Sequence, residues 1–90
     1  MNEKKLYIWH LADFLSRHEK RMSGEELATH LNRNNFMTEY ETEYEGGRGT
    51  YTLIEATYKW LKNDLQFSKE ASKVAEAFVK PDGSYAYRTE

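Results

Sequence analysis

Three histidines are the residues of this sequence best suited to acid–base or metal chemistry: His10, His18 and His30. His10 and His18 lie eight positions apart, roughly on one side of a predicted helix, whereas His30 belongs to another segment. None has a second histidine four positions later, as in the zinc motif H-E-x-x-H, which places two histidines on one helical face. We therefore expect solvated histidines, no metal site, no cofactor and no catalytic residue.

A glycine-rich segment, Gly46-Gly47-Arg48-Gly49-Thr50, precedes another predicted helix. Free N–H groups at a helix N-terminus attract anions, so such a segment has some of the character of a phosphate-binding loop. However, the G-x-x-x-x-G-K-[ST] spacing is missing and no strand clearly precedes the segment. An anion-binding enzyme fragment built on 46–52 is therefore a minor alternative, and we expect that the protein is not an enzyme.

A strongly acidic stretch lies just before these glycines. Glutamate alternates there with tyrosine and threonine: Glu39, Tyr40, Glu41, Thr42, Glu43, Tyr44 and Glu45. Alternation is typical of a strand, but like charges along one face weaken a sheet. We therefore predict a loop over residues 36–49, with short extended pairing left open. The carboxylates repel phosphate within a Debye length of about 8 Å, and tyrosine is enriched at protein interfaces. The stretch favours a protein partner, although a merely solvated loop explains it equally well.

The composition limits the class of protein. The chain has 90 residues, of which 39% are hydrophobic and 31% charged, and a net charge of −2. This length fits a single domain, residues 1–90, with a thin core. A sequence pI near 5.9 argues against a general nucleic-acid binder, which is usually basic. Cysteine is absent, and no apolar run approaches the length that spans a bilayer. We expect a cytoplasmic protein that does not bind membranes.

The first two helices are predicted from periodicity and capping. Apolar residues recur three and four positions apart over residues 6–19, which indicates a helix. A second helix should run from about 24 to 33. It begins at a capping box, in which the Ser23 hydroxyl accepts a hydrogen bond from the backbone three residues later and Glu26 reaches back. Asn32, Asn34 and Asn35 end it, because asparagine tolerates the left-handed conformation of a helix stop.

The third and fourth helices follow the glycine-rich segment. The third opens at Thr50 or Thr52, and Thr52 with Glu55 forms a second candidate capping box. The fourth begins at Ser68, and its apolar face extends to Phe78.

Turn-forming residues, Pro81-Asp82-Gly83, then end the predicted fourth helix. The remaining tail, 84–87, should be extended, with Tyr85 or Tyr87 on the core. The prediction is an all-α, four-helix, helix-turn-helix-like domain with an acidic loop between its second and third helices.

Residues 23–60 resemble the helix-turn-helix DNA-binding segment of large serine recombinases. The likeness rests on an Ala-x-x-Leu-Asn helix ending at Asn32, a turn containing Thr38, an aromatic residue, and a helix containing Leu53-Ile54. Asn35 and Tyr40–Glu41 stand where that pattern usually has glycines, and the loop is longer and more acidic. The whole chain also resembles small proteins of enterobacterial phages and plasmids that have a GGRGTYTLI-type segment. That second resemblance implies no activity.

The recombinase resemblance implies that the start of the third helix enters a DNA major groove. Arg48 would pair with guanine, while nearby hydroxyls and N–H groups would contact phosphate. The candidate DNA-binding residues are Arg33, Arg48, Thr50, Tyr51, Thr52, Lys59 and Lys62. Structural roles explain the same residues: the threonines cap the helix, Arg48 pairs with neighbouring glutamates, and Lys59 is solvated.

Two functions remain open. The first is a small, non-enzymatic DNA-binding or transcription-regulatory accessory protein of mobile-element origin. The alternative is a protein-interaction module, or DNA mimic, that binds a host protein through residues 39–51. Its candidate contact residues are Glu39, Tyr40, Glu41, Glu43, Tyr44 and Glu45.

Exposed tyrosines and the position of the charges bear on this choice. Beyond Tyr58, which has core spacing, the other six tyrosines exceed what so thin a core can hold, which indicates an exposed contact surface or a homodimer. A basic face containing Arg33, Arg48, Lys59 and Lys62 would favour DNA. Glutamates over the N-terminus of the third helix would favour a protein partner.

Overall fold

The computed structural model describes residues 3–38, 40–45 and 48–87. Four α-helices lie in this part of the chain: α1 (Glu3–Arg17), α2 (Gly24–Arg33), α3 (Arg48–Lys59) and α4 (Ser68–Ala77). A π-helix, η1 (Trp60–Asp64), continues α3, and two short strands, β1 (Met22–Ser23) and β2 (Phe78–Val79), complete the secondary structure described. The predicted all-α, four-helix class is confirmed.

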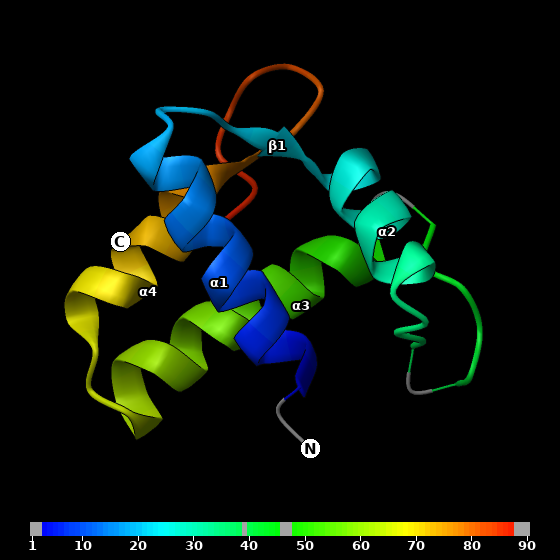
Figure 1. Cartoon of the computed structure of the whole chain (residues 1–90), viewed down its shortest axis with the longest axis horizontal. Helices are drawn as coiled ribbons and strands as arrows, with labels where there is room; N and C mark the ends of the chain where they lie inside the picture. The colour runs from blue at the N-terminus through cyan, green and yellow to red at the C-terminus, as the bar shows by residue number, and fades with distance from the viewer. Residues whose placement is uncertain (1–2, 39, 46–47, 88–90) are drawn as a thin grey trace.

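Helices α1, α3 and α4 contact one another and form the body of the domain, while α2 packs against α3 at one end (Figure 1). Strands β1 and β2 pair in parallel, with Met22 opposite Phe78 and Ser23 opposite Val79. This pairing joins the segment before α2 to the end of α4. The small sheet was not predicted, because strands of two residues have no periodicity to detect.

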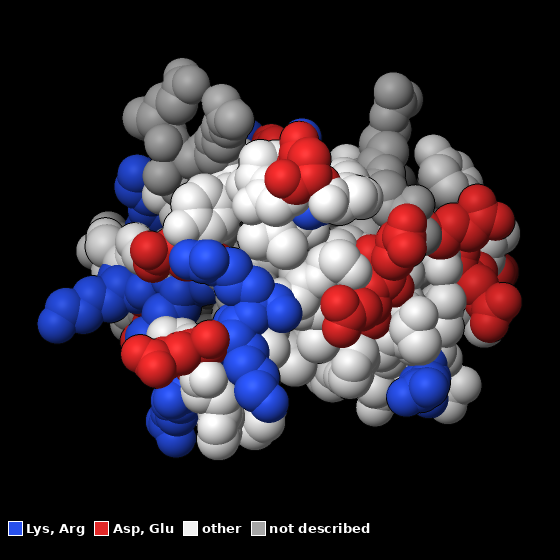
Figure 2. Space-filling view, turned by 90° about the horizontal axis from the view of Figure 1, so that it is seen from above, with Lys and Arg blue, Asp and Glu red and all other residues white. Residues whose placement is uncertain are grey.

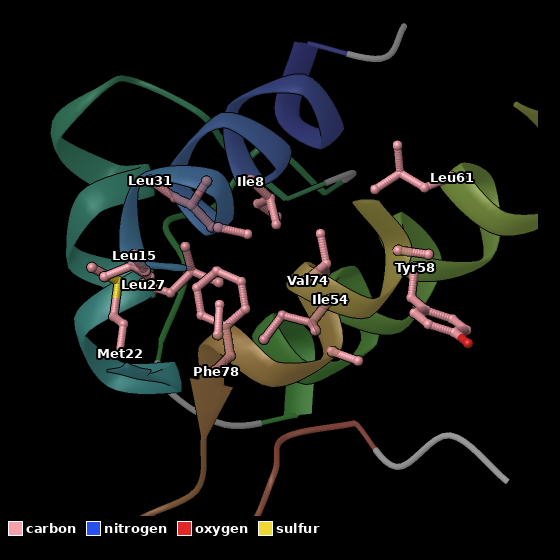
Figure 3. Close-up of a cluster of buried hydrophobic side chains, with 14 of the residues drawn as sticks. Ile8, Leu15, Met22, Leu27, Leu31, Ile54, Tyr58, Leu61, Val74 and Phe78 are labelled. Atoms are coloured by element: carbon pink, nitrogen blue, oxygen red, sulfur yellow. The ribbon is translucent and has the colours of Figure 1, made fainter. Parts of the chain in front are cut away.

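The core lies between the helices and is closed by β2. Figure 3 shows the Phe78 ring in the middle of a cluster that extends from Met22 and Leu27 at one end to Tyr58 and Leu61 at the other. Phe78 is fully buried. We predicted that it belongs to the fourth helix, which was wrong: α4 ends at Ala77, and Phe78 has extended backbone at φ −118° and ψ 139°. The extended conformation allows Phe78 to fill the core while its backbone pairs with β1.

The ends of two other helices also differ from the prediction. α1 spans residues 3–17 instead of 6–19, and it stops where Glu19 takes a left-handed φ of 53°. α3 begins at Arg48, before both predicted starting threonines. Thr52 therefore lies within the helix and does not cap it. Thr50 is fully buried and its hydroxyl donates to the carbonyl oxygen of Glu45 at 3.4 Å.

The C-terminal tail follows the prediction. The backbone N–H of Lys80 donates to Ser84 O at 2.7 Å across the predicted turn, and Val79 forms an antiparallel bridge with Tyr85. The tail thus returns along β2. Tyr87 packs against the core, with its ring centroid 4.9 Å from that of Tyr58, whereas Tyr85 is 40% exposed.

The start of α2 is the predicted one. Ser23 has extended backbone, and its Oγ accepts a hydrogen bond from the Glu26 N–H at 3.1 Å. The same hydroxyl donates to Glu26 Oε1 at 3.4 Å. One otherwise unpaired N–H of the first helical turn is therefore satisfied, and the predicted boundaries of 24–33 are confirmed.

Loss of this cap should be measurable. We expect Ser23→Ala to lower the free energy of unfolding by about 1 kcal/mol, because the Glu26 N–H then has no protein partner. Chemical denaturation followed by circular dichroism measures the change. Ser72→Ala, at an exposed position inside α4, is the matched control and should be neutral or slightly stabilising. Equal midpoints for the wild type and Ser23→Ala would contradict the capping role.

Charged and polar contacts join α1 to α4 at the edge of the core. Lys73 Nζ donates to Asp13 Oδ1 at 3.0 Å, and Arg17 Nε lies 3.0 Å from Asp13 Oδ2. Trp9 Nε1 donates to Glu70 Oε2 at 3.0 Å. The Lys73 hydrogen bond is the main cause that lowers the pKa of Asp13 below 3.8, assisted by the charge of Arg17 and opposed by partial burial.

The sign of this pKa shift predicts a pH dependence. A carboxyl whose pKa is depressed on folding stabilises the protein above its unfolded pKa, and this contribution is lost as pH falls through the folded pKa. We therefore expect Asp13→Asn to unfold at lower denaturant concentration than wild type at pH 7. The two midpoints should converge as pH falls below 3.8, because the wild-type Asp13 then becomes protonated.

A matched control separates this effect from net charge. Asp64→Asn removes the same charge from an exposed position in η1. It should change the midpoint little at either pH. A difference between wild type and Asp13→Asn that stays constant with pH would refute the ion-pair explanation.

Candidate interaction surface

The acidic stretch connects α2 to α3 as a loop, which confirms the main prediction for it. We call residues 36–45 the acidic loop; Glu39 within it lies outside the described residues, as do Gly46 and Gly47 beyond it. The described residues of the loop contain no strand, so the short extended pairing left open above does not form there.

Thr38 and Thr42 close the tip of the acidic loop. The Thr38 N–H donates to Thr42 O at 2.9 Å, and the Glu41 N–H donates to Thr38 O at 2.9 Å. The Thr38 hydroxyl oxygen accepts from the N–H groups of Tyr40 and Thr42, each at 3.2 Å, and lies 2.7 Å from the Thr42 hydroxyl oxygen. Glu41 adopts a left-handed φ of 60°. This turn holds Tyr40 in solvent, where its side chain is 81% exposed.

Asn32 attaches the second half of the acidic loop to α2. Its Nδ2 donates to Tyr44 O at 2.8 Å, and its Oδ1 accepts from the Tyr44 N–H at 2.8 Å. The side-chain amide thus pairs with both backbone polar groups of one residue, as a neighbouring strand would. The arrangement fixes the path of the loop as it approaches α3.

Tyr44 points inward from this segment and is only 7% exposed. Its hydroxyl accepts from Lys4 Nζ at 3.0 Å, and the ammonium lies 5.2 Å from the ring centroid. Little of this predicted partner-contacting side chain is therefore accessible to a partner, although the residue lines the groove described below. The alternation seen in the sequence explains this result: side chains of an extended segment face opposite sides, so Tyr44 turns inward while Glu43 and Glu45 are exposed.

A groove of about 500 Å³ lies between the acidic loop, α3 and the start of α1. We call it the loop groove. Its surface is mostly apolar, and no glutamate is among the described residues that line it. The residues that line it include Lys4, Tyr40, Thr42, Tyr44, Leu53 and Ala56.

The exposed carboxylates of the acidic loop lie beside this groove. Glu41, Glu43 and Glu45 are exposed, and no ion pair joins them to any side chain that the structure describes. Figure 2 shows acidic side chains gathered mostly over α2 and the acidic loop, and basic side chains mostly over α4 and the C-terminal end of α1. We call the second group the basic end; it includes Arg17, Lys20, Arg21 and Lys73.

Four of the predicted DNA-binding residues lie at the start of α3: Arg48, Thr50, Tyr51 and Thr52. Thr50 is fully buried, so the prediction that its side chain contacts phosphate is wrong. Tyr51 is half-buried against Gly24, where an added Cβ would lie 2.6 Å from the Tyr51 ring. Thr52 is exposed and lines the loop groove. Arg48 is the first residue of α3.

The other predicted DNA-binding residues lie elsewhere. Lys59 forms an ion pair with Glu55 at 2.9 Å, and this contact raises the pKa of Lys59 above 10.5. Lys62, in η1, has its ammonium 5.6 Å from the Tyr58 ring centroid. Arg33 is exposed at the end of α2. Arg33 and Lys62 thus belong to two elements, α2 and η1, that lie at opposite sides of the molecule in Figure 1.

The link between α2 and α3 is long for a helix-turn-helix. It runs from residue 34 to residue 47, whereas the turn of that motif has about three or four residues. The two helices do contact each other. α2 and α3 are therefore neighbours, but a long segment that contains the acidic loop, and not a short turn, connects them.

The histidines are separated in the fold. His10 stacks on Trp9 with ring centroids 5.8 Å apart, and the His18 ring lies 4.4 Å from that of Phe14. His30 Nδ1 lies 3.4 Å from the Tyr7 hydroxyl. The described residues include no group of histidine and acidic side chains that could hold a metal ion. Within the same ranges, no helix has the length and apolar character needed to cross a membrane.

Comparison with protein-family models, with curated proteins and with solved structures finds no match for this chain. The resemblances to large serine recombinases and to phage and plasmid proteins therefore stay predictions. Fold and site together define a small four-helix domain with one ordered acidic loop beside an apolar groove.

Two residues that build this surface were not identified from the sequence. Asn32 was expected only to end α2, yet it lies in the last turn and its amide reaches the loop. Lys4 contacts Tyr44 from a position forty residues away in the chain. A polar amide within a short amphipathic helix is a weak local signal for the first contact. No local pattern indicates the second.

The role of Asn32 can be tested by removing its amide. We expect Asn32→Ala to lower the free energy of unfolding by about 1–3 kcal/mol, because both backbone polar groups of Tyr44 lose their partner. Hydrogen exchange followed by NMR should show faster exchange of the Tyr44 amide. Asn63→Ala, at an exposed position in η1, is the control and should leave that amide unchanged. Unaltered Tyr44 protection in Asn32→Ala would exclude the proposed attachment.

Proposed function

We propose that this protein is a non-enzymatic interaction module that binds a basic protein partner through the acidic loop. The observation that carries the proposal is the hydrogen-bonded tip, with Tyr40 and the glutamates exposed beside the apolar loop groove. Hot spots of protein interfaces are enriched in tyrosine, and complementary charge speeds association. A cytoplasmic location and a mobile-element origin belong to the same proposal, supported by the lack of cysteine and by the resemblance to phage and plasmid proteins.

DNA binding stays a second proposal, favoured by the basic end. Its cations gather on the side of the molecule away from most of the acidic side chains (Figure 2), where the glutamates of the loop repel phosphate least. The residues expected from the sequence support DNA binding less well, because Thr50 is buried, Lys59 is paired with Glu55, and Arg33 and Lys62 belong to elements at opposite sides of Figure 1.

Titration with two probes separates these functions. The first probe is a nona-arginine peptide and the second a 20-base-pair duplex of mixed sequence, each at about 50 and 200 mM salt. We expect the peptide to bind, more weakly at the higher salt, and the triple variant Glu41→Gln/Glu43→Gln/Glu45→Gln to reduce its affinity at least about fivefold. Fluorescence anisotropy of the labelled probe measures both affinities.

The control removes equal charge elsewhere. Glu19→Gln/Glu25→Gln/Glu76→Gln neutralises three exposed glutamates outside the acidic loop, and should keep near wild-type affinity for the peptide. An equal loss in both triple variants would show a general effect of net charge and overturn the proposal. Binding of the duplex without binding of the peptide would favour the DNA function instead.

A further inference from the structure

We infer that the partner presents a cationic segment with one large apolar side chain, which inserts into the loop groove while the flanking cations meet the glutamates of the acidic loop. The inference rests on the proposed function and specifies its ligand. It follows from how apolar surface and charge are divided in this part of the molecule.

The groove itself suits an uncharged side chain. Leu53 and Ala56 of α3 and the Tyr44 ring supply carbon surface, and the volume of about 500 Å³ is in the range of ligand pockets. Its one described cation, Lys4, is held 3.0 Å from the Tyr44 hydroxyl. A second cation placed inside the groove would be repelled by Lys4, whereas an aromatic or aliphatic group buries apolar area without that cost.

The glutamates define what must flank the apolar side chain. Thr42 and Tyr44 line the groove, and the exposed Glu41, Glu43 and Glu45 alternate with them along the same segment. The carboxylates are therefore at the rim and not in the groove. A partner that places its apolar side chain in the groove brings residues two or three positions away to this rim. Positive charge at those positions complements the carboxylates.

Contacts within the chain also hold the acidic loop. Thr38 is hydrogen-bonded to Thr42, and the Asn32 amide pairs with the backbone of Tyr44. Tyr40 lines the groove and yet is 81% exposed, so a bound side chain would cover it. Binding then orders few additional backbone units, and less of the interaction energy is lost to entropy.

Three peptides separate the contribution of the apolar side chain from that of the charge. They are Arg-Arg-Gly-Trp-Gly-Arg-Arg, the same peptide with alanine in place of tryptophan, and the tryptophan peptide with glutamate in place of arginine. We expect the first to bind about tenfold more tightly than the second, and the third not to bind. ¹⁵N–¹H correlation spectra of the full chain should show shifts for Leu53, Ala56 and Thr42.

A variant that fills the groove tests whether the apolar side chain of the peptide binds there. Thr52→Arg places a long cationic side chain at an exposed position that lines the groove, so the tenfold preference for tryptophan should disappear. Thr29→Arg makes the same change at an exposed position of α2 and should keep the preference. Retention of the preference in Thr52→Arg would place the apolar side chain elsewhere and overturn the inference.

The remaining outcomes separate this inference from the proposed function. Equal binding of the tryptophan and alanine peptides, lost in the triple glutamine variant of the loop, would keep the proposed function and refute the apolar insertion. Failure of both cationic peptides to bind would refute both. Shifts of the groove residues on concentrating the protein alone would identify a second copy of this chain as the occupant and overturn the assignment to a separate partner.

Discussion

The packing of α1 on α4 limits where the other elements can lie. The buried face of α4 consists of small residues, Ala71, Val74, Ala75 and Ala77, which let a second helix approach closely. At the edge of this contact, Lys73 donates a hydrogen bond to Asp13, and Trp9 donates one to Glu70. These two contacts fix the position of α1 along α4 as well as the distance between the two helices. In a chain of 90 residues a thin core gives little stability to spare, and these contacts determine the direction in which α4 ends. β2 and its partner β1 follow from that direction.

The acidic loop depends on the same framework through α1 and α2. Lys4, at the start of α1, reaches the Tyr44 hydroxyl, while Asn32 holds the backbone of the same residue. Tyr7 of α1 accepts a hydrogen bond from Asn34 at 3.2 Å, which joins the end of α2 to α1. A loop with several like charges is disfavoured by its own repulsion. These contacts from two helices offset that repulsion, and so a polar segment keeps a defined shape beside the groove.

The sequence predicted those features that are coded locally. Ser23 and Glu26 predicted the start of α2, and the series of like charges before the glycine-rich segment predicted the loop. Phe78 was misassigned because its apolar spacing continues that of α4, and only pairing with β1, far away in the chain, extends its backbone. Tyr44 was expected at a surface because tyrosine is enriched at protein interfaces, and Thr50 because the recombinase resemblance places it against phosphate. Both are buried, and Tyr44 contacts Lys4 from forty positions away in the chain. Long-range contacts of this kind leave no local pattern.

The division between charge and apolar surface is the strongest link from this fold to a function. A solvated loop needs neither a tip closed by threonine hydroxyls nor an attached tyrosine, since water would satisfy its polar groups. Here the hydroxyl and amide contacts keep Tyr40 exposed, and Glu41 keeps a left-handed φ of 60° that a glycine or asparagine would adopt more easily. Glu19, Asn35 and Gln66 share this backbone conformation. What distinguishes the acidic loop is its hydrogen-bonded tip beside an apolar groove, which supports the proposed partner surface, with its specificity divided between the carboxylates at the rim and the carbon surface within.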